Sequence, residues 1–127
     1  MLVSDYMSTA PVTVHSEDNY DLAFEIMEQK NMHHLPVVDQ HNQVVGIVTK
    51  RDLQLAARYF KEAPAEISEV MHTPVFTTSG SASLSSAAKQ MNDNRIGCLP
   101  VIGDDKHVAG MLTETDLFRA LSDLLDA

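Results

Sequence analysis

A threonine is followed three residues later by an aspartate at two places, Thr49 with Asp52 and Thr113 with Asp116. Both pairs follow an apolar run typical of a buried strand and open a segment with helical spacing, so each stands at a predicted strand-to-helix junction. A helix start attracts anions through its dipole and its unpaired N–H groups, and a threonine hydroxyl can join them on a phosphate. An aspartate can accept two hydrogen bonds from the vicinal hydroxyls of a ribose. The pattern therefore indicates a ribose-phosphate site.

The same spacing has a second interpretation. Thr-x-x-Asp at a helix start also forms a capping box, in which the two side chains satisfy N–H groups of the helix itself. Gly46 and Gly110, which precede the pairs, would then only permit close packing. Two identical copies favour the ligand, because a cap tolerates several residue types. A recent duplication alone would also preserve them, so both interpretations stay open.

The two pairs belong to an internal repeat. Shifting the first half forward by 64 positions superimposes Leu35-Pro36-Val37 on Leu99-Pro100-Val101 and the first Thr/Asp pair on the second. We therefore divide the chain into repeat 1 (1–60), a linker (61–66) and repeat 2 (67–127). Because one such unit cannot bury its apolar face alone, the repeats should form a pseudo-symmetric pair.

Each repeat has the pattern of a β-α-β-β-α unit. Periodicity and turn residues predict strands at 11–14, 35–38, 44–48, 75–78, 99–102 and 108–112. Helices are expected after Asn19, over 49–60, over 84–91 and from Thr113. The run 44–48 is apolar enough for a strand buried on both faces. The predicted fold class is α+β, close to α/β in element order, with two repeats packed sheet to sheet about a pseudo-two-fold axis.

The composition limits the function classes. The 127 residues carry a formal net charge of −9, which argues against a basic patch for nucleic acid or an anionic membrane. Cys98 is the only cysteine, so no intrachain disulfide is possible and a reducing compartment is expected. No secretory signal or membrane span is visible. We therefore expect a cytoplasmic protein. The sequence also shows no paired acids, activated nucleophile or phosphate loop at catalytic spacing, so we expect no catalytic residues.

The order Met-x-x-x-Pro-Val, Leu-Pro-Val and Gly-x-x-Thr-x-x-Asp recurs in the second half, with one residue fewer in its first motif. This order resembles a tandem pair of CBS domains, a Bateman module, over essentially the whole chain. The resemblance implies a regulatory module that binds AMP, ADP, ATP or S-adenosylmethionine in two clefts. It also implies that the aspartates take the ribose hydroxyls and the threonines take phosphate, with no further cofactor.

The resemblance carries over residue by residue to two clefts. Cleft A joins the second Thr/Asp pair to residues of repeat 1. Its members are Thr9, Pro11, Val12, Met32, His33, His34, Pro36, Thr113 and Asp116. Cleft B joins the first pair to residues of repeat 2. Its members are Thr49, Lys50, Arg51, Asp52, Thr73, Val75, Ile96, Gly97, Cys98 and Pro100.

The two clefts differ in charge. Lys50 and Arg51 lie near Asp52, with Arg95 as a further candidate, whereas Glu114 occupies the position that matches Lys50 in the other repeat. We therefore expect cleft B to tolerate more phosphate charge than cleft A. Met32 is the residue we expect against an adenine face.

The histidines and Cys98 are not expected to bind a metal or to react. Neighbouring histidines on an extended segment point to opposite faces, and no cysteine or carboxylate completes a ligand set, so we expect no metal site. The histidines concerned are His15, His33, His34, His41, His72 and His107. Cys98 has no evident activating cation and is expected to be a buried or cleft-wall thiol.

The last helix is apolar over a wide arc that includes Phe118, Leu121 and Leu124. Such an arc indicates either a helix-mediated homodimer or a plain core helix. We therefore hypothesise a stand-alone regulatory module that binds an adenosine-type ligand and signals to an unknown effector protein. The alternative is a structural or dimerisation module with vestigial clefts.

Overall fold

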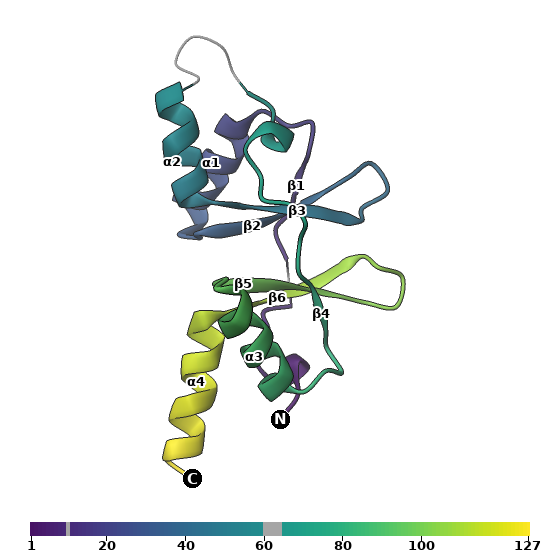
Figure 1. Ribbon diagram of the computed structural model, residues 1–127, viewed down its shortest axis with the longest axis vertical. Helices are drawn as coiled ribbons and strands as arrows, with labels where there is room; N and C mark the ends of the chain where they lie inside the picture. The colour runs from purple at the N-terminus through teal and green to yellow at the C-terminus, as the bar shows by residue number, and fades with distance from the viewer. Residues whose placement is uncertain (10, 60–64) are drawn as a thin grey trace. The chain divides into compact units, whose positions relative to one another are not determined.

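The computed structural model describes residues 1–9, 11–59 and 65–127 and forms two compact units (Figure 1). Unit 2 is Val12–Val75, and unit 1 combines Met1–Pro11 with Phe76–Ala127. The opening segment of each repeat therefore belongs to the unit built mainly from the other repeat. Of the predicted repeat 1 and linker, residues 10 and 60–64 lie outside the described residues.

Unit 2 has the predicted β-α-β-β-α order. Its elements are β1 (Val14–His15), α1 (Tyr20–Lys30), β2 (His34–Val38), β3 (Val44–Thr49), α2 (Lys50–Tyr59) and the 3-10 helix η2 (Ile67–Glu69). The strands form one sheet in the order β1-β2-β3, in which β1 is parallel and β3 antiparallel to β2. Glu66 forms a β-bridge with Asn19, so the segment before η2 is attached to the start of α1.

Unit 1 repeats this architecture. Its elements are η1 (Val3–Asp5), β4 (Thr78–Ser79), α3 (Leu84–Asn94), β5 (Cys98–Ile102), β6 (Val108–Thr113) and α4 (Glu114–Leu125). The sheet order is β4-β5-β6, again with one parallel and one antiparallel pairing. The two three-stranded sheets and their helices confirm the mixed α+β class.

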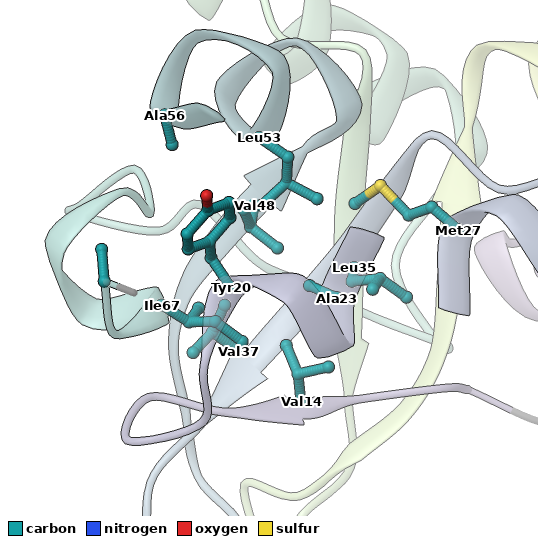
Figure 2. Close-up of a cluster of buried hydrophobic side chains, with 11 residues drawn as sticks. Val14, Tyr20, Ala23, Met27, Leu35, Val37, Val48, Leu53, Ala56 and Ile67 are labelled. Atoms are coloured by element: carbon teal, nitrogen blue, oxygen red, sulfur yellow. The ribbon is translucent and has the colours of Figure 1, made fainter. Parts of the chain in front are cut away.

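The core of unit 2 lies between the sheet and its helices (Figure 2). It is formed by Val14, Tyr20, Ala23, Met27, Leu35, Val37, Val48, Leu53, Ala56, Ala65 and Ile67. Ile67 of η2 is fully buried in it. Val3 of η1 is likewise fully buried in the core of unit 1. Each exchanged segment is therefore fixed by an apolar anchor.

The first strand of each unit is shorter than the sequence predicted. Strands were expected at 11–14 and 75–78, whereas β1 and β4 contain two residues each. Val14 pairs with Val37, and Thr78 pairs with Val101. Val37 follows Pro36 and Val101 follows Pro100. Proline has no N–H to donate, so the parallel pairing ends at these two residues.

The third strand of unit 2 is buried on one face and half-buried on the other. Gly46 and Val48 are buried, whereas Val45 and Ile47 are half-buried. The prediction that 44–48 is buried on both faces was therefore wrong for this unit. An antiparallel edge strand needs to cover only one side of a core.

Gly46 and Gly110, which occupy equivalent positions in the two repeats, each lie where two segments of the chain cross closely. Ile47 forms a β-bridge with His72 in unit 2, and Met111 forms one with Ser8 in unit 1. A Cβ on Gly46 would lie 2.6 Å from Met71 Sδ, and a Cβ on Gly110 would overlap the Ser8 carbonyl oxygen. The close-packing interpretation of these glycines is confirmed.

Candidate functional site

The first Thr/Asp pair lies where β3 runs into α2. The Thr49 N–H donates to Asp52 Oδ2 over 2.9 Å, and the Asp52 N–H donates to Thr49 Oγ1 over 3.1 Å. These reciprocal bonds are a capping box, so the capping interpretation is correct as local structure. The bonds use one carboxylate oxygen and one lone pair of the hydroxyl, and a carboxylate offers about four acceptor positions. Capping and ligand binding are therefore compatible.

The second pair repeats this geometry at the start of α4. Thr113 is the N-cap residue, and its N–H donates to Asp116 Oδ2 over 2.9 Å. The Thr113 hydroxyl donates to the same oxygen over 3.4 Å. Both capping boxes thus hold the aspartate by Oδ2 and direct Oδ1 elsewhere.

The other oxygen of each carboxylate contacts a different basic group. Asp52 Oδ1 lies 2.8 Å from His72 Nε2, and Asp116 Oδ1 lies 2.9 Å from Arg119 Nη2. The aspartate side chains are only 14% and 12% exposed, whereas those of His72 and Arg119 are 66% and 59% exposed. Each basic group can therefore move into solvent, provided that ligand hydroxyls replace it as donors to the nearly buried carboxylate.

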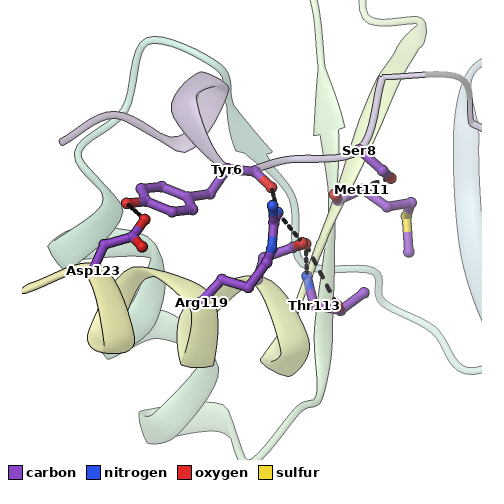
Figure 3. Close-up of polar contacts among 7 residues, drawn as sticks. Tyr6, Ser8, Met111, Thr113, Arg119 and Asp123 are labelled. Atoms are coloured by element: carbon purple, nitrogen blue, oxygen red, sulfur yellow. Dashed lines mark hydrogen bonds and ion pairs between the residues drawn. The ribbon is translucent and has the colours of Figure 1, made fainter. Parts of the chain in front are cut away.

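Arg119 is also held by the N-terminal segment of unit 1 (Figure 3). Its Nη2 donates to the Tyr6 carbonyl over 2.8 Å, and its guanidinium carbon lies 5.7 Å from the centroid of the Tyr6 ring. The Tyr6 hydroxyl donates to Asp123 Oδ2 over 2.6 Å. This bond to a carboxylate, more than burial, raises the pKa of Tyr6.

The backbone at the helix starts is less open than the sequence predicted. The Lys50 N–H donates to the His33 carbonyl over 2.9 Å, and the Glu114 N–H donates to the Gly97 carbonyl over 3.2 Å. With the N–H groups inside the capping boxes, several donors expected for phosphate are therefore already used. A phosphate would have to rely on the threonine hydroxyls, the helix dipole and basic side chains.

The charge difference between the repeats is smaller than the sequence suggests. Lys50 Nζ lies 3.1 Å from Glu28 Oε1 of α1, so part of its charge is neutralised within unit 2. Arg51 is exposed in the first turn of α2. Arg95 ends α3 in the left-handed conformation, with φ 54°, and belongs to unit 1.

The members of each predicted cleft are divided between the two units. Of cleft A, Thr9, Pro11, Thr113 and Asp116 belong to unit 1, and Val12, Met32, His33, His34 and Pro36 to unit 2. Of cleft B, Thr49, Lys50, Arg51, Asp52, Thr73 and Val75 belong to unit 2, and Ile96, Gly97, Cys98 and Pro100 to unit 1. Met32 packs against the core of unit 2 and is half-buried. Both clefts stay predictions.

Cys98 is buried at the start of β5, as expected for an inert thiol. Burial, with a smaller contribution from the Glu114 carboxylate, raises its pKa to about 12. The neutral thiol is not a nucleophile at physiological pH. Within residues 1–9, 11–59 and 65–127, no cluster of three metal-ligating side chains is found.

Sequence reasoning missed the ionic partners of the aspartates. Arg119 follows Asp116 by three residues on one helix, a spacing that brings two side chains together, so its signal was present. His72 follows Asp52 by twenty positions, and only the crossing beside Gly46 brings it there. The only hint of His72 in the sequence was that the equivalent residue of repeat 1 is Ser8 and not a histidine.

The geometry agrees with comparisons to known proteins. The model of the CBS domain matches residues 3–58 and again residues 67–123. The chain belongs to the CBS domain family. The two matches make it a CBS domain pair, as the resemblance predicted. No helix in the described part of this pair is long and apolar enough to cross a membrane.

The pair is similar both to parts of larger enzymes and to isolated modules. The L-aspartate semialdehyde sulfurtransferase of Methanocaldococcus jannaschii is 34% identical over 118 residues, which cover 93% of this chain and 23% of that protein. The chain spans about a quarter of the length of the first curated relatives it matches.

Two solved structures share the fold of this CBS domain pair over nearly its full length. The CBS domain pair of protein MJ0100, in complex with 5′-methylthioadenosine and S-adenosyl-L-methionine, has a TM-score of 0.88 and 31% identity and covers 98% of both chains. CBSX2 in complex with AMP has a TM-score of 0.82 and 25% identity and covers 97% of both chains. These relatives bind compounds that contain adenosine.

Proposed function

We propose that this CBS domain pair is a regulatory module that binds an adenosine-containing ligand through Asp52 and through Asp116. One observation carries the proposal. Each carboxylate is nearly buried and fixed by Oδ2, while its Oδ1 contacts an exposed basic side chain. A preorganised acceptor with a replaceable partner suits the vicinal hydroxyls of a ribose, since binding then requires little rearrangement.

The relatives support the class of ligand. S-adenosyl-L-methionine, 5′-methylthioadenosine and AMP, which the two solved relatives bind, share an adenosine with free 2′ and 3′ hydroxyls. They differ at the 5′ position, where charge ranges from a sulfonium to a phosphate. We therefore propose that the diol and the base are the common requirement, and that the 5′ group sets the preference of each site.

The rest of each cleft belongs to the same proposal. The residues expected around Asp116 are Thr9, Pro11, Val12, Met32, His33, His34, Pro36 and Thr113. Those expected around Asp52 are Thr49, Lys50, Arg51, Thr73, Val75, Ile96, Gly97, Cys98 and Pro100. The Asp52 site would tolerate more phosphate charge, mainly through Arg51, because Glu28 neutralises part of Lys50.

We further propose that the module acts by binding and not by catalysis, in the cytoplasm. Its effect would pass to a separate effector protein or to a domain joined to the pair, since the chain covers about a quarter of the first curated relatives it matches. A homodimer through helices is supported by α4, on which Phe118, Leu121 and Leu124 are exposed. Beside them, unit 1 has an apolar hollow of about 350 Å³ whose lining includes Leu84 and Leu117.

A second candidate is an interaction module whose clefts are vestigial. The complete capping boxes favour it, because they explain the two Thr/Asp pairs without any ligand. The two candidates differ in whether an acceptor on the aspartate is needed for anything besides stability.

Asparagine variants separate these candidates. In Asp52→Asn and Asp116→Asn the amide oxygen can still accept the capping N–H, but the amide nitrogen cannot accept a ribose hydroxyl. We expect wild-type protein to bind two equivalents of 5′-methylthioadenosine in equilibrium dialysis and each single variant to bind one. Melting temperatures without ligand should change by less than about 3 °C.

Two controls sharpen the result. A 2′-deoxyadenosine competitor should displace the ligand at least about tenfold less well than adenosine, since it lacks one of the two hydroxyls. The interaction module would be favoured if the double variant bound as much ligand as the wild type. It would also be favoured if AMP, ADP, ATP, S-adenosylmethionine and 5′-methylthioadenosine all left the melting temperature unchanged.

A further inference from the structure

His72 occupies the oxygen of Asp52 that the proposed ligand needs. Asp52 Oδ2 is committed to the Thr49 N–H, and Asp52 Oδ1 lies 2.8 Å from His72 Nε2. A ribose that binds Asp52 through both hydroxyls must therefore take Oδ1 from the imidazole or share it. The inference that follows rests on the proposed function, because it concerns the same aspartate.

The main chain of His72 is fixed while its side chain is exposed. The His72 N–H donates to the Ile47 carbonyl over 2.7 Å, and the Ile47 N–H donates to the His72 carbonyl over 3.2 Å. Gly46 allows this crossing, because a Cβ there would lie 3.0 Å from the His72 carbonyl oxygen. The imidazole can therefore leave Asp52 by side-chain rotation alone, without a change in the backbone.

The equivalent place in unit 1 has no titratable group. Ser8 makes the same crossing, with its N–H donating to the Met111 carbonyl over 2.9 Å. Its hydroxyl contacts that same carbonyl over 3.4 Å. Asp116 Oδ1 instead meets Arg119, which stays charged at every physiological pH. Both aspartates thus present Oδ1 as an acceptor, but its basic partner is a histidine at Asp52 and an arginine at Asp116.

The charged groups on the elements around His72 are carboxylates and basic side chains, together with His34 of β2, which pairs with Thr49 of β3. On α2 these are Asp52, Arg51 and Lys50, the last paired with Glu28. Glu69 of η2 is on the same segment as His72, and β3, which His72 crosses, carries no ionisable side chain. Histidine is the side chain whose charge ordinarily changes between pH 5 and 8. His72 contacts the Asp52 carboxylate directly, so a proton linkage there is assigned to His72, and the substitutions at position 72 separate its contribution from that of His34.

We propose that His72 makes ligand binding at Asp52 proton-linked, whereas Arg119, the partner of the Asp116 carboxylate, stays charged and adds no such linkage. The protonated imidazole pairs with Asp52 and competes with the ribose; the neutral imidazole competes less. A ligand that takes Oδ1 deprives His72 of the partner that favours its charged form, so binding releases a proton. Affinity at Asp52 consequently rises with pH.

Adenosine is the suitable probe, because it has the diol and no phosphate that titrates near pH 6. In Asp116→Asn protein, which keeps only the Asp52 site, titration calorimetry should give binding at least about five-fold weaker at pH 5.5 than at pH 7.5. Measured near pH 6.5 in buffers of different ionisation enthalpy, the heats should report proton release. In Asp52→Asn protein, a further His72→Gln substitution should leave the pH dependence of binding at the Asp116 site unchanged.

Two substitutions at position 72 assign the effect. His72→Gln keeps a donor for Asp52 but cannot gain a charge, and His72→Ser introduces the residue found at the equivalent position of repeat 1. In the Asp116→Asn background, both should bind adenosine at pH 5.5 as tightly as at pH 7.5. A merely structural role for His72 would lower affinity equally at both pH values, which would overturn the proposal.

The outcomes distinguish this inference from the proposed function. Absence of adenosine binding at both sites and at every pH would overturn both. Binding at the Asp52 site that does not change with pH would overturn only the proton linkage. A pH dependence that survives in His72→Gln would overturn it as well, since another group would then carry the proton.

Discussion

At the scale of single residues, one carboxylate performs two tasks in each repeat. Asp52 and Asp116 both cap a helix through Oδ2 and both contact a basic group through Oδ1. The identity of the two Thr/Asp pairs therefore follows from capping as well as from the proposed ligand. What differs is the partner of Oδ1, and that difference gives each site its own chemistry.

Cys98 should be chemically inert in the folded protein. Its pKa is raised to about 12, mainly by burial, so the neutral thiol persists and roughly one molecule in ten thousand carries a thiolate at pH 8. Labelling by Ellman's reagent at pH 8 should be at least about a hundredfold slower in buffer than in urea.

The same shift has a consequence for stability. A thiol that holds its proton more tightly when folded destabilises the folded state as pH rises above the ordinary thiol pKa. Cys98→Ser should therefore flatten the loss of stability between pH 9 and pH 10. Labelling in buffer as fast as in urea would show that the thiol is accessible, and would contradict both expectations.

At the scale of elements, the sequence predicted most of the fold because its signals were local. Asn19 caps α1 and Thr113 caps α4, as their residue types indicated. The short β1 was not predicted, because its length depends on Pro36 of a different strand. The exchange of opening segments was not predicted either, since it depends on where Val3 and Ile67 are buried.

In the candidate site, too, the local features could be predicted from the sequence and the features that depend on tertiary contacts could not. The Thr/Asp pairs could be found because the two residues are neighbours on one helical turn. His72 and the carbonyls of His33 and Gly97 meet these turns only through tertiary contacts. The sequence therefore predicted the acceptors of the site correctly and predicted more open backbone donors than the fold leaves.

Substitution by alanine should cost more stability at Gly110 than at Gly46, because different atoms lie at the two chain crossings. A Cβ on Gly110 would overlap the Ser8 carbonyl oxygen, a backbone atom, whereas a Cβ on Gly46 would mainly meet the flexible Met71 side chain. We expect Gly110→Ala to lower the free energy of unfolding by about 2–3 kcal/mol and Gly46→Ala by about 1 kcal/mol, measured by urea denaturation.

Gly80 supplies the control for this comparison. A Cβ there would make only ordinary contacts, 3.5 Å from Ser4 Cβ and 3.9 Å from Met7 Cε. Gly80→Ala should therefore change stability by less than about 0.5 kcal/mol. Equal losses for Gly46→Ala and Gly110→Ala would mean that the Ser8 segment can move away, and the crossing would not be the reason for the glycine.

At the scale of the whole molecule, the last helices of the two repeats differ in their exposed side chains. Position 118 of α4 is a phenylalanine that is 68% exposed, and the equivalent position of α2 is Gln54. Leu121 and Leu124 extend the exposed apolar face of α4. A monomer gains nothing from these side chains in water, so a homodimer that forms through helices should use α4 in preference to α2.

The proposed dimer can therefore be tested with a matched pair of variants. Phe118→Glu should raise the dimer dissociation constant by about a hundredfold or more in analytical ultracentrifugation, because each copy loses a buried aromatic side chain and buries a charge instead. The melting temperature of the dissociated protein should stay unchanged, since Phe118 is exposed within its own unit. Gln54→Glu introduces the same charge on α2 and should leave the dimer intact. If Gln54→Glu dissociates the dimer and Phe118→Glu does not, the interface lies on α2, and the apolar face of α4 needs another explanation.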